Sequence, residues 1–165
     1  MLWLKQIGQW LVAVTLQVLL INQLQLGGIC HPFIYILPLL VMPITLPRWA
    51  DMLIGLATGL LMDVFCNSFG VHAAACVLLM YARQPLIALW LSDTDRLTDT
   101  ISMRSIGNAP FIKYTAFLIV VHHLMVFFLS AWTIQLWWYT LLTTLVSSTV
   151  SITLILGYSW IQDKR

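Results

Sequence analysis

The chain has 165 residues, of which 61% are hydrophobic and only 8% are charged, and its mean hydropathy is +0.92. A soluble domain carries about 45–50% apolar and about 25% charged residues, so this composition excludes a soluble fold. The net charge of +2 is too small to indicate a nucleic-acid-binding protein. The composition therefore predicts an all-α, polytopic integral membrane protein, with residues 1–165 forming a single transmembrane domain.

Apolar runs predict about six spans, because a helix needs about 20 mainly apolar residues to cross the hydrocarbon core. The first run ends before Asn22 and the Gly27-Gly28 pair. The second is short and contains Pro38 and Pro43, so it is expected to be a broken span packed among its neighbours, with a re-entrant segment as the alternative. The predicted spans are 3–21, 33–46, 49–65, 71–90, 111–131 and 136–160.

Two segments connect the later spans. Between the third and fourth spans lies a compact turn, in which Asn67 or Ser68 is expected to cap the fourth helix. Between the fourth and fifth lies a polar segment, 92–109, which we interpret as a solvated loop. The alternative is a short interfacial helix with Leu97 and Ile101 facing the membrane.

The basic residues predict the orientation. Loops that face the cytoplasm collect Lys and Arg, and the three loops on one side of the predicted topology contain neither. Both termini and loop 92–109 are therefore expected to be cytoplasmic. The basic residues on that side are Lys5, Arg48, Arg83, Arg96, Arg104, Lys113, Lys164 and Arg165.

A face of small residues leads to an acid in the third span. Gly55, Gly59 and Asp63 recur every four residues, so they lie on one helix face that another helix can approach closely. A charge at this depth costs about 2.5–3.5 kcal/mol and requires a partner. His72, which follows Gly70 after the turn, returns to the same depth and is the expected partner. We interpret the pair as a structural lock of the hairpin, with a proton relay or ligand site as the alternative.

Other polar residues inside the spans are expected to have structural roles. His122 and His123 point to different sides of the fifth span and are predicted to hydrogen-bond within the bundle. A metal site built from Asp63, His72 and His122 would require three helices to converge, so no metal or cofactor is predicted. Asp51 and Arg83 are expected to pair across the hairpin, with Arg83 near enough to the membrane surface to snorkel.

Cys30 and Cys66 fall in predicted exported loops, where oxidation to a disulfide is possible. Cysteines without a framework around them are more often unpaired, and that is the expectation here.

The central stretch resembles the rod shape-determining protein MreD family, in the branch found in Bacteroidetes. The similarity lies in Gly59-Leu-Leu-Met-Asp63 followed by Gly70-Val-His72-Ala-Ala, and it extends over nearly the whole chain. Val71 stands where Leu is frequent in that family. Further similar segments are Pro32-Phe33-Ile-Tyr35-Ile-Leu, Leu46-Pro47-Arg48-Trp49 and Val121-His122-His123-Leu.

The resemblance implies a non-enzymatic subunit of the cell-elongation machinery in the bacterial inner membrane. Members of the family associate with the single-span protein MreC, and they act with MreB, RodA and the elongation-specific penicillin-binding transpeptidase in lateral peptidoglycan synthesis. It also implies a fold similar to the substrate-binding membrane subunits of energy-coupling-factor vitamin importers. The face formed by Gly55, Gly59 and Asp63, or the hairpin next to it, is then expected to shape the surface for MreC.

Two other function classes follow from the residues. A polar cavity around Asp63, His72 and His122 would suit a small-molecule-binding subunit of a transporter, but the first span lacks the repeated small-residue spacing through which such subunits usually dock. An intramembrane enzyme is disfavoured because no nucleophile and base are paired in the sequence pattern. Self-association of the chain is compatible with the cell-elongation function and with the transporter function.

Overall fold

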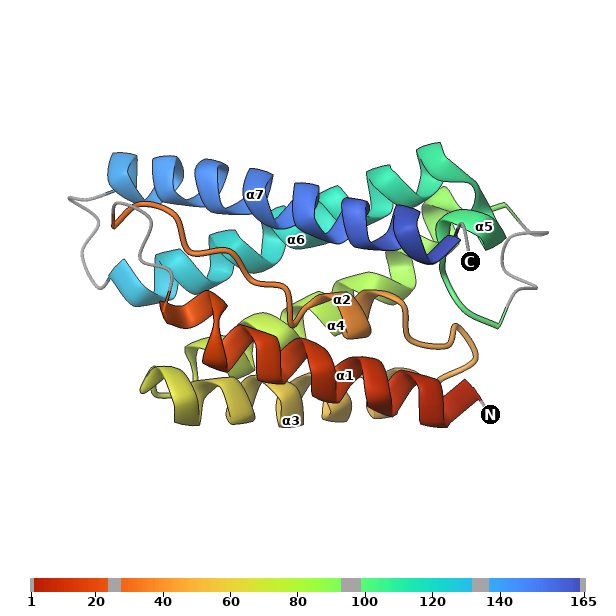
Figure 1. Ribbon diagram of the computed structural model, residues 1–165, viewed down its shortest axis with the longest axis horizontal. Coiled ribbons are helices and arrows are strands. Elements are labelled where there is room, and N and C mark those ends of the chain that lie inside the picture. Colours follow the sequence, from red (N-terminus) through yellow and green to blue (C-terminus); the bar gives the residue numbers. More distant parts are fainter. Residues whose placement is uncertain (1, 24–27, 93–98, 132–136, 164–165) are drawn as a thin grey trace.

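The computed structural model describes residues 2–23, 28–92, 99–131 and 137–163 (Figure 1). Its elements are α1 (Leu2–Leu19), the 3-10 turn η1 (Ile21–Gln23), α2 (Leu37–Leu40), α3 (Arg48–Cys66), α4 (Val71–Trp90), α5 (Met103–Ile106), α6 (Asn108–Ala131) and α7 (Trp137–Asp163). The described residues form no β-sheet, only an isolated bridge between Pro43 and Thr100. The predicted all-α bundle is confirmed.

Among the described residues, five helices are long and apolar enough to cross a membrane: α1 extended by η1, α3, α4, α6 and α7. Their axes run between the same two ends of the molecule, and both termini lie at one end (Figure 1). Five crossings alone would leave the termini at opposite ends. A sixth, non-helical crossing therefore has to exist.

Residues 28–47, which we call the second crossing, supply it. The segment begins beside α7, where the Tyr139 hydroxyl donates to the carbonyl of Gly28 at 2.7 Å. It runs to the opposite end of the bundle as an irregular chain of turns and a short extended stretch, with α2 as its only helical turn (Figure 1). The second predicted span is therefore not a transmembrane helix. Its course from one end of the bundle to the other agrees with a broken span rather than with a re-entrant segment.

The prolines explain why this crossing is not helical. Pro38 lies in the first turn of α2, where its missing N–H costs nothing. Pro43 comes just after α2, and a helix cannot readily continue because the residue before a proline avoids the helical conformation. An interrupted backbone is tolerated at membrane depth only where protein or water surrounds it.

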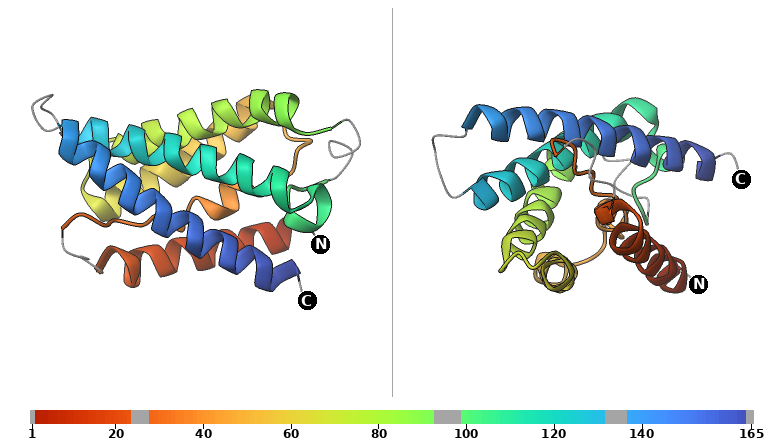
Figure 2. Two further views of the ribbon diagram at one scale, coloured as in Figure 1. Left: turned by 90° about the horizontal axis from the view of Figure 1, so that it is seen from above. Right: turned by 60° about the vertical axis from the view of Figure 1, so that its left-hand side comes forward.

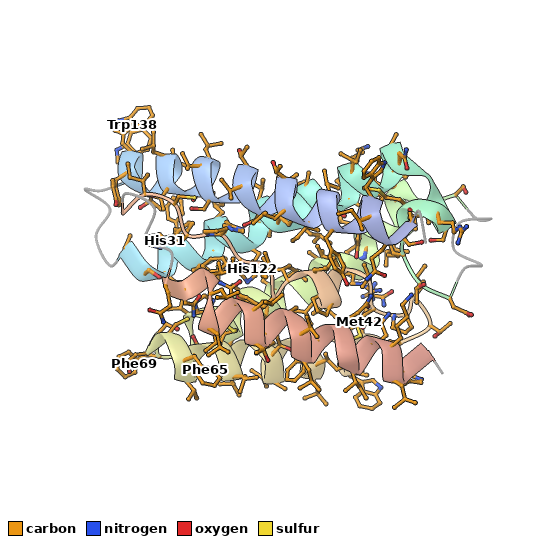
Figure 3. All side chains as sticks on the ribbon, viewed as in Figure 1. His31, Met42, Phe65, Phe69, His122 and Trp138 are labelled. Atoms are coloured by element: carbon orange, nitrogen blue, oxygen red, sulfur yellow. The ribbon has the colours of Figure 1, made fainter. Side chains whose placement is uncertain are left out.

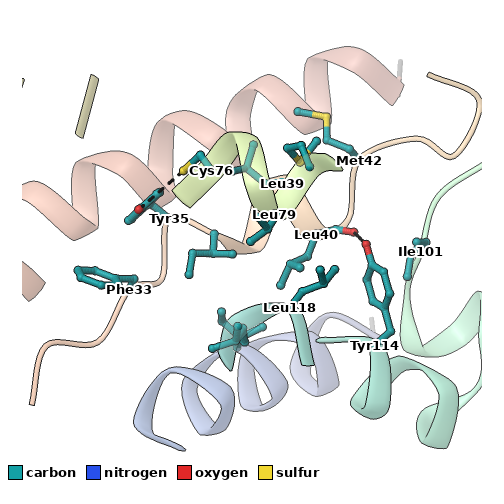
Figure 4. Close-up of a cluster of buried hydrophobic side chains, with 14 of the residues drawn as sticks. Phe33, Tyr35, Leu39, Leu40, Met42, Cys76, Leu79, Ile101, Tyr114 and Leu118 are labelled. Atoms are coloured by element: carbon teal, nitrogen blue, oxygen red, sulfur yellow. Dashed lines mark hydrogen bonds between the residues drawn. The ribbon is translucent and has the colours of Figure 1, made fainter. Parts of the chain in front are cut away.

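The second crossing lies at the centre of the core. Tyr35, Ile36, Leu39 and Leu40 are all fully buried. Figure 4 shows Leu39 and Leu40 in one cluster with Leu79 of α4 and Leu118 of α6. The right-hand view in Figure 2 shows the long helices arranged around the segment. The least helical part of the chain is thus the part most thoroughly enclosed by the rest.

The two ends of the bundle differ in charge. We call the end that carries Lys5, Arg48, Arg104 and Lys113 the basic end, and the end with the α3–α4 turn the hairpin end. Arg96, Lys164 and Arg165 lie outside the described residues. The positive-inside pattern predicts that the basic end is cytoplasmic.

The polar segment 92–109 is only partly described. Leu97 lies outside the described residues, whereas Ile101 is fully buried against the core, so the prediction that Ile101 faces the membrane is wrong. Ser102 and Ser105 form a reciprocal capping box at the start of α5, and α6 begins soon afterwards at Asn108.

Candidate functional site

Polar side chains from α7 bind the hairpin-end half of the second crossing. The backbone N–H of His31 donates to Oγ of Ser147, and that of Phe33 donates to Oγ of Ser151, both at 2.9 Å. The two serines lie four residues apart, on one helix face. They supply hydrogen-bond acceptors that an extended segment in an apolar core otherwise lacks.

Side chains of α1 act in the same way from the other side. Gln17 uses both ends of its amide, donating to the carbonyl of Pro32 at 3.1 Å and accepting from the N–H of Ile34 at 2.7 Å. Gln6 donates to the carbonyl of Val41 at 3.1 Å. A glutamine carries both a donor and an acceptor, so it can replace a missing backbone partner.

Arg83 binds the basic-end half of the second crossing. It pairs with Asp51 at 2.9 Å and donates to the carbonyls of Met42 and Pro43. Its Nε donates to the Tyr114 hydroxyl at 3.2 Å. The guanidinium has five donors in a fixed planar arrangement, which allows one side chain to bind several acceptors at once.

Two further residues form hydrogen bonds with the same half of the second crossing. The Tyr114 hydroxyl donates to the carbonyl of Leu40 at 3.0 Å (Figure 4). Gln84 donates to the carbonyl of Leu46 at 3.2 Å and to the Asp51 carboxylate at 2.9 Å. The predicted pairing of Asp51 with Arg83 is confirmed. The prediction that Arg83 snorkels is wrong, because both side chains are completely buried.

Tyr35 joins two histidines in the middle of the bundle. Its hydroxyl lies 2.9 Å from Nδ1 of His72 and 2.9 Å from Nε2 of His122. A hydroxyl has one hydrogen, so one imidazole accepts from it while the other donates to it. Cys76 contacts the same hydroxyl group, with its Sγ 3.8 Å from the Tyr35 oxygen. The two histidines are thus brought together by a residue of the second crossing, from α4 and α6.

His123 belongs to a separate chain of hydrogen bonds. Its Nδ1 lies 2.8 Å from the carbonyl of Ile119, which can only accept, so Nδ1 carries the proton. Nε2 is then the acceptor for the Ser151 hydroxyl at 3.0 Å. The predicted hydrogen bonding of His122 and His123 within the bundle is confirmed. The prediction that they point to different sides is wrong, because both rings pack against Phe33, at 5.8 Å and 4.9 Å between centroids.

Asp63 binds the first turn of α4. Its carboxylate accepts from the backbone N–H groups of His72 and Ala73, each at 2.9 Å, and from the Ser68 hydroxyl at 2.5 Å. A carboxylate is favoured at a helix N-terminus by the exposed N–H groups and by the helix dipole. The expected partnership of Asp63 with His72 therefore exists, but it uses the backbone of His72 rather than its imidazole.

The expected caps of α4 are wrong for the same reason. Asn67 ends α3 in the left-handed conformation, with a φ of 53°, and Ser68 bonds to Asp63. Gly70 precedes α4 with a φ of 92°, a value that favours glycine. The N–H groups of α4 are satisfied instead by an acid from the end of the preceding helix.

The glycine face of α3 packs directly on α4. A Cβ at Gly59 would lie 2.4 Å from Cα of Ala73, and one at Gly55 would lie 2.9 Å from the carbonyl oxygen of Cys76. Only glycine permits this separation of the two backbones. Gly55, Gly59 and Asp63 are buried against the chain's own helix, so this face is not available for direct contact with another protein.

A cavity of about 660 Å³ lies between the second crossing and the hairpin end of the bundle. His31 and Phe33 line it from the second crossing, and His72, Phe127 and Thr143 line it from three helices. Cys66 also lines this cavity, and Cys30, Cys66 and Cys76 are all unpaired in the structure.

Comparison of the chain with family models, curated proteins and solved structures gives no match. The site is therefore interpreted from its own contacts.

Sequence reasoning missed the residues that hold the second crossing, namely Gln17, Tyr114, Ser147 and Ser151. A signal for the last two is present in the sequence. Hydroxyl residues recur at three- and four-residue intervals along one face of α7, at Thr140, Thr143, Thr144, Ser147, Ser148 and Ser151. A polar stripe of this kind in a membrane helix indicates a face that binds other polar groups.

Proposed function

We propose that this multi-pass membrane protein is a non-enzymatic subunit of the bacterial cell-elongation machinery, acting with MreC in the inner membrane. The resemblance to the MreD family around Asp63 and His72 supports the assignment. MreB, RodA and the elongation-specific penicillin-binding transpeptidase are then further members of the same complex.

The observation that carries the proposal is the use of the buried charges. Among the described residues, the buried charged side chains are Asp51, Asp63 and Arg83, and each binds the chain's own backbone or another of the three. A charge inside a membrane protein is costly and often marks an ion or substrate path. Here the charges fix the geometry of the bundle, which is what a scaffold requires.

The tip of the α3–α4 hairpin is the surface that we assign to MreC. Phe69 at the tip is 92% exposed and has a φ of 46°, which a bulky side chain seldom adopts. Figure 3 shows Phe69 and Phe65 both at the hairpin end of the molecule. In the predicted orientation this end faces the periplasm, where family members meet MreC. An exposed aromatic side chain held in a strained conformation is a suitable anchor for a partner.

Co-purification tests this assignment. The protein and the MreC encoded in the same genome are co-expressed, and MreC is expected to be recovered with the wild-type chain. Phe69→Gly is expected to lower the recovery about tenfold, equivalent to about 1.4 kcal/mol of binding. The same change relieves the positive φ, so the variant is expected to be at least as stable as the wild type.

Trp49→Ala is the matched control, because Trp49 is an exposed aromatic residue in the first turn of α3, at the basic end of the bundle. Equal recovery of MreC with the wild type and Phe69→Gly would remove the tip from the proposal. Absence of MreC from the wild-type preparation, together with unchanged cell shape on depletion of the protein, would contradict the proposed function itself.

A further inference from the structure

The cavity at the hairpin end has the size of a small-molecule site. Ligand pockets in proteins are typically about 300–1,000 Å³, and this one measures about 660 Å³. It penetrates between the second crossing and the helices as far as His72, which is only 4% exposed. This cavity is not filled by any of the side chains described above as stabilising the bundle.

Two polar groups at this cavity have unused hydrogen-bonding capacity. Thr143 is 4% exposed, and its buried hydroxyl has no partner among the described residues. Nδ1 of His72 is bound to Tyr35, but no described residue binds its Nε2. A buried hydroxyl without a partner, such as that of Thr143, costs about 1–3 kcal/mol, and a ligand that binds it recovers that cost.

Aromatic rings also line this cavity. The rings of Phe33 and Phe127 lie 6.0 Å apart between centroids and are inclined by only 30°. His31 lies 6.2 Å from Phe127 and adds to the same surface. Flat ring systems pack well on such a surface, in stacked or edge-on arrangements.

The residues that line the cavity also indicate the charge of the ligand that it can bind. No Asp, Glu, Lys or Arg is among the residues that line the cavity. The nearby carboxylate of Asp63 already accepts three hydrogen bonds from Ser68, His72 and Ala73. A charged ligand would lose its hydration at this site without gaining a counter-charge.

We propose that this cavity binds a flat, uncharged heteroaromatic molecule. Its ring packs against Phe33 and Phe127, and its polar edge meets the Thr143 hydroxyl and Nε2 of His72. The proposal goes beyond the scaffold function and does not depend on it.

Binding is tested on the full-length protein in lipid nanodiscs with three uncharged heteroaromatic probes, indole, adenine and lumichrome. Each is titrated to about 1 mM, which corresponds to a binding free energy of about −4 kcal/mol. At least one probe is expected to saturate. Thr143→Val, which keeps the shape of the side chain but removes the hydroxyl, is expected to weaken its affinity about tenfold, and Phe127→Leu by a similar factor.

Thr153→Val is the matched control, since Thr153 lies on the same helix, is exposed, and donates only to the carbonyl of Thr149. Its affinity for the probe is expected to equal that of the wild type. Failure of all three probes to bind would overturn the proposal. So would binding that Thr143→Val and Phe127→Leu leave unchanged, or a tightly retained phospholipid found by native mass spectrometry that no probe displaces.

Discussion

The α3–α4 hairpin and the second crossing both lie inside the bundle, but their backbones find hydrogen-bond partners in different places. In the hairpin the partners are local: each helix bonds to itself, and Asp63 reaches N–H groups only nine and ten residues ahead. In the second crossing they are remote: Ser147 and Ser151 lie 116 and 118 residues from the groups they bind. A helix can form wherever its sequence allows, whereas an extended segment in a membrane depends on the rest of the fold.

Arg83→Met is expected to have the largest effect on stability. It leaves Asp51 charged and buried without its counter-ion, and it removes the donor to the carbonyls of Met42 and Pro43. Breaking a buried pair by removing one partner costs about 3–5 kcal/mol. The free energy of unfolding, measured in mixed micelles, is expected to fall by this amount.

Arg104→Met is the control for a loss of charge, because Arg104 is exposed on α5. The double variant Asp51→Leu/Arg83→Met is expected to regain part of the stability, since it removes both buried charges. A decrease no larger for Arg83→Met than for Arg104→Met would mean that the second crossing does not depend on the ion pair.

Gly59→Ala tests the hairpin. The added methyl group would lie 2.4 Å from Cα of Ala73, so α3 and α4 must move apart. Overpacking of this kind costs about 1–3 kcal/mol, and the same unfolding measurement is expected to show it. Gly157→Ala is the matched control, because no atom lies within 4 Å of the new methyl group. If the two variants are equally stable, α3 and α4 do not make this close contact at Gly59.

Ser151→Ala is expected to have the smallest effect, about 1 kcal/mol, in line with single hydrogen bonds measured inside membrane proteins. Its specific signature is faster hydrogen exchange at the Phe33 amide, which loses its acceptor. Thr153→Val, on the lipid-facing side of α7, is expected to leave that exchange rate unchanged. Unaltered exchange in Ser151→Ala would show that the serine does not hold the second crossing.

The features predicted from the sequence are those that depend on nearby residues. The bounds of α3 and α4, the approach of helices at Gly55 and Gly59, and the pairing of Asp51 with Arg83 all follow from spacing along one hairpin. Hydropathy indicated that the second crossing is surrounded by apolar groups, in agreement with its burial in the core, and its prolines indicated an interruption.

The remaining features could not be predicted because they depend on distant partners. Hydropathy does not distinguish an extended crossing from a helical one when both are buried. The position of Tyr35 between His72 and His122 requires three segments to meet, and no local pattern specifies that meeting. The capping of α4 by Asp63 was missed because the cap comes from the preceding helix rather than from the turn.

Because its hydrogen-bond partners lie far along the sequence, the second crossing acquires them only late in synthesis. When residues 31–33 leave the ribosome, the serines that will bind their N–H groups are still more than a hundred residues from being made. At about 5–20 residues per second, the delay is several seconds or longer. During that time the segment cannot rest in lipid with its backbone unpaired. It must wait in the translocon or at the water interface until α7 arrives, so a helix made more than a hundred residues later completes the surroundings of this segment.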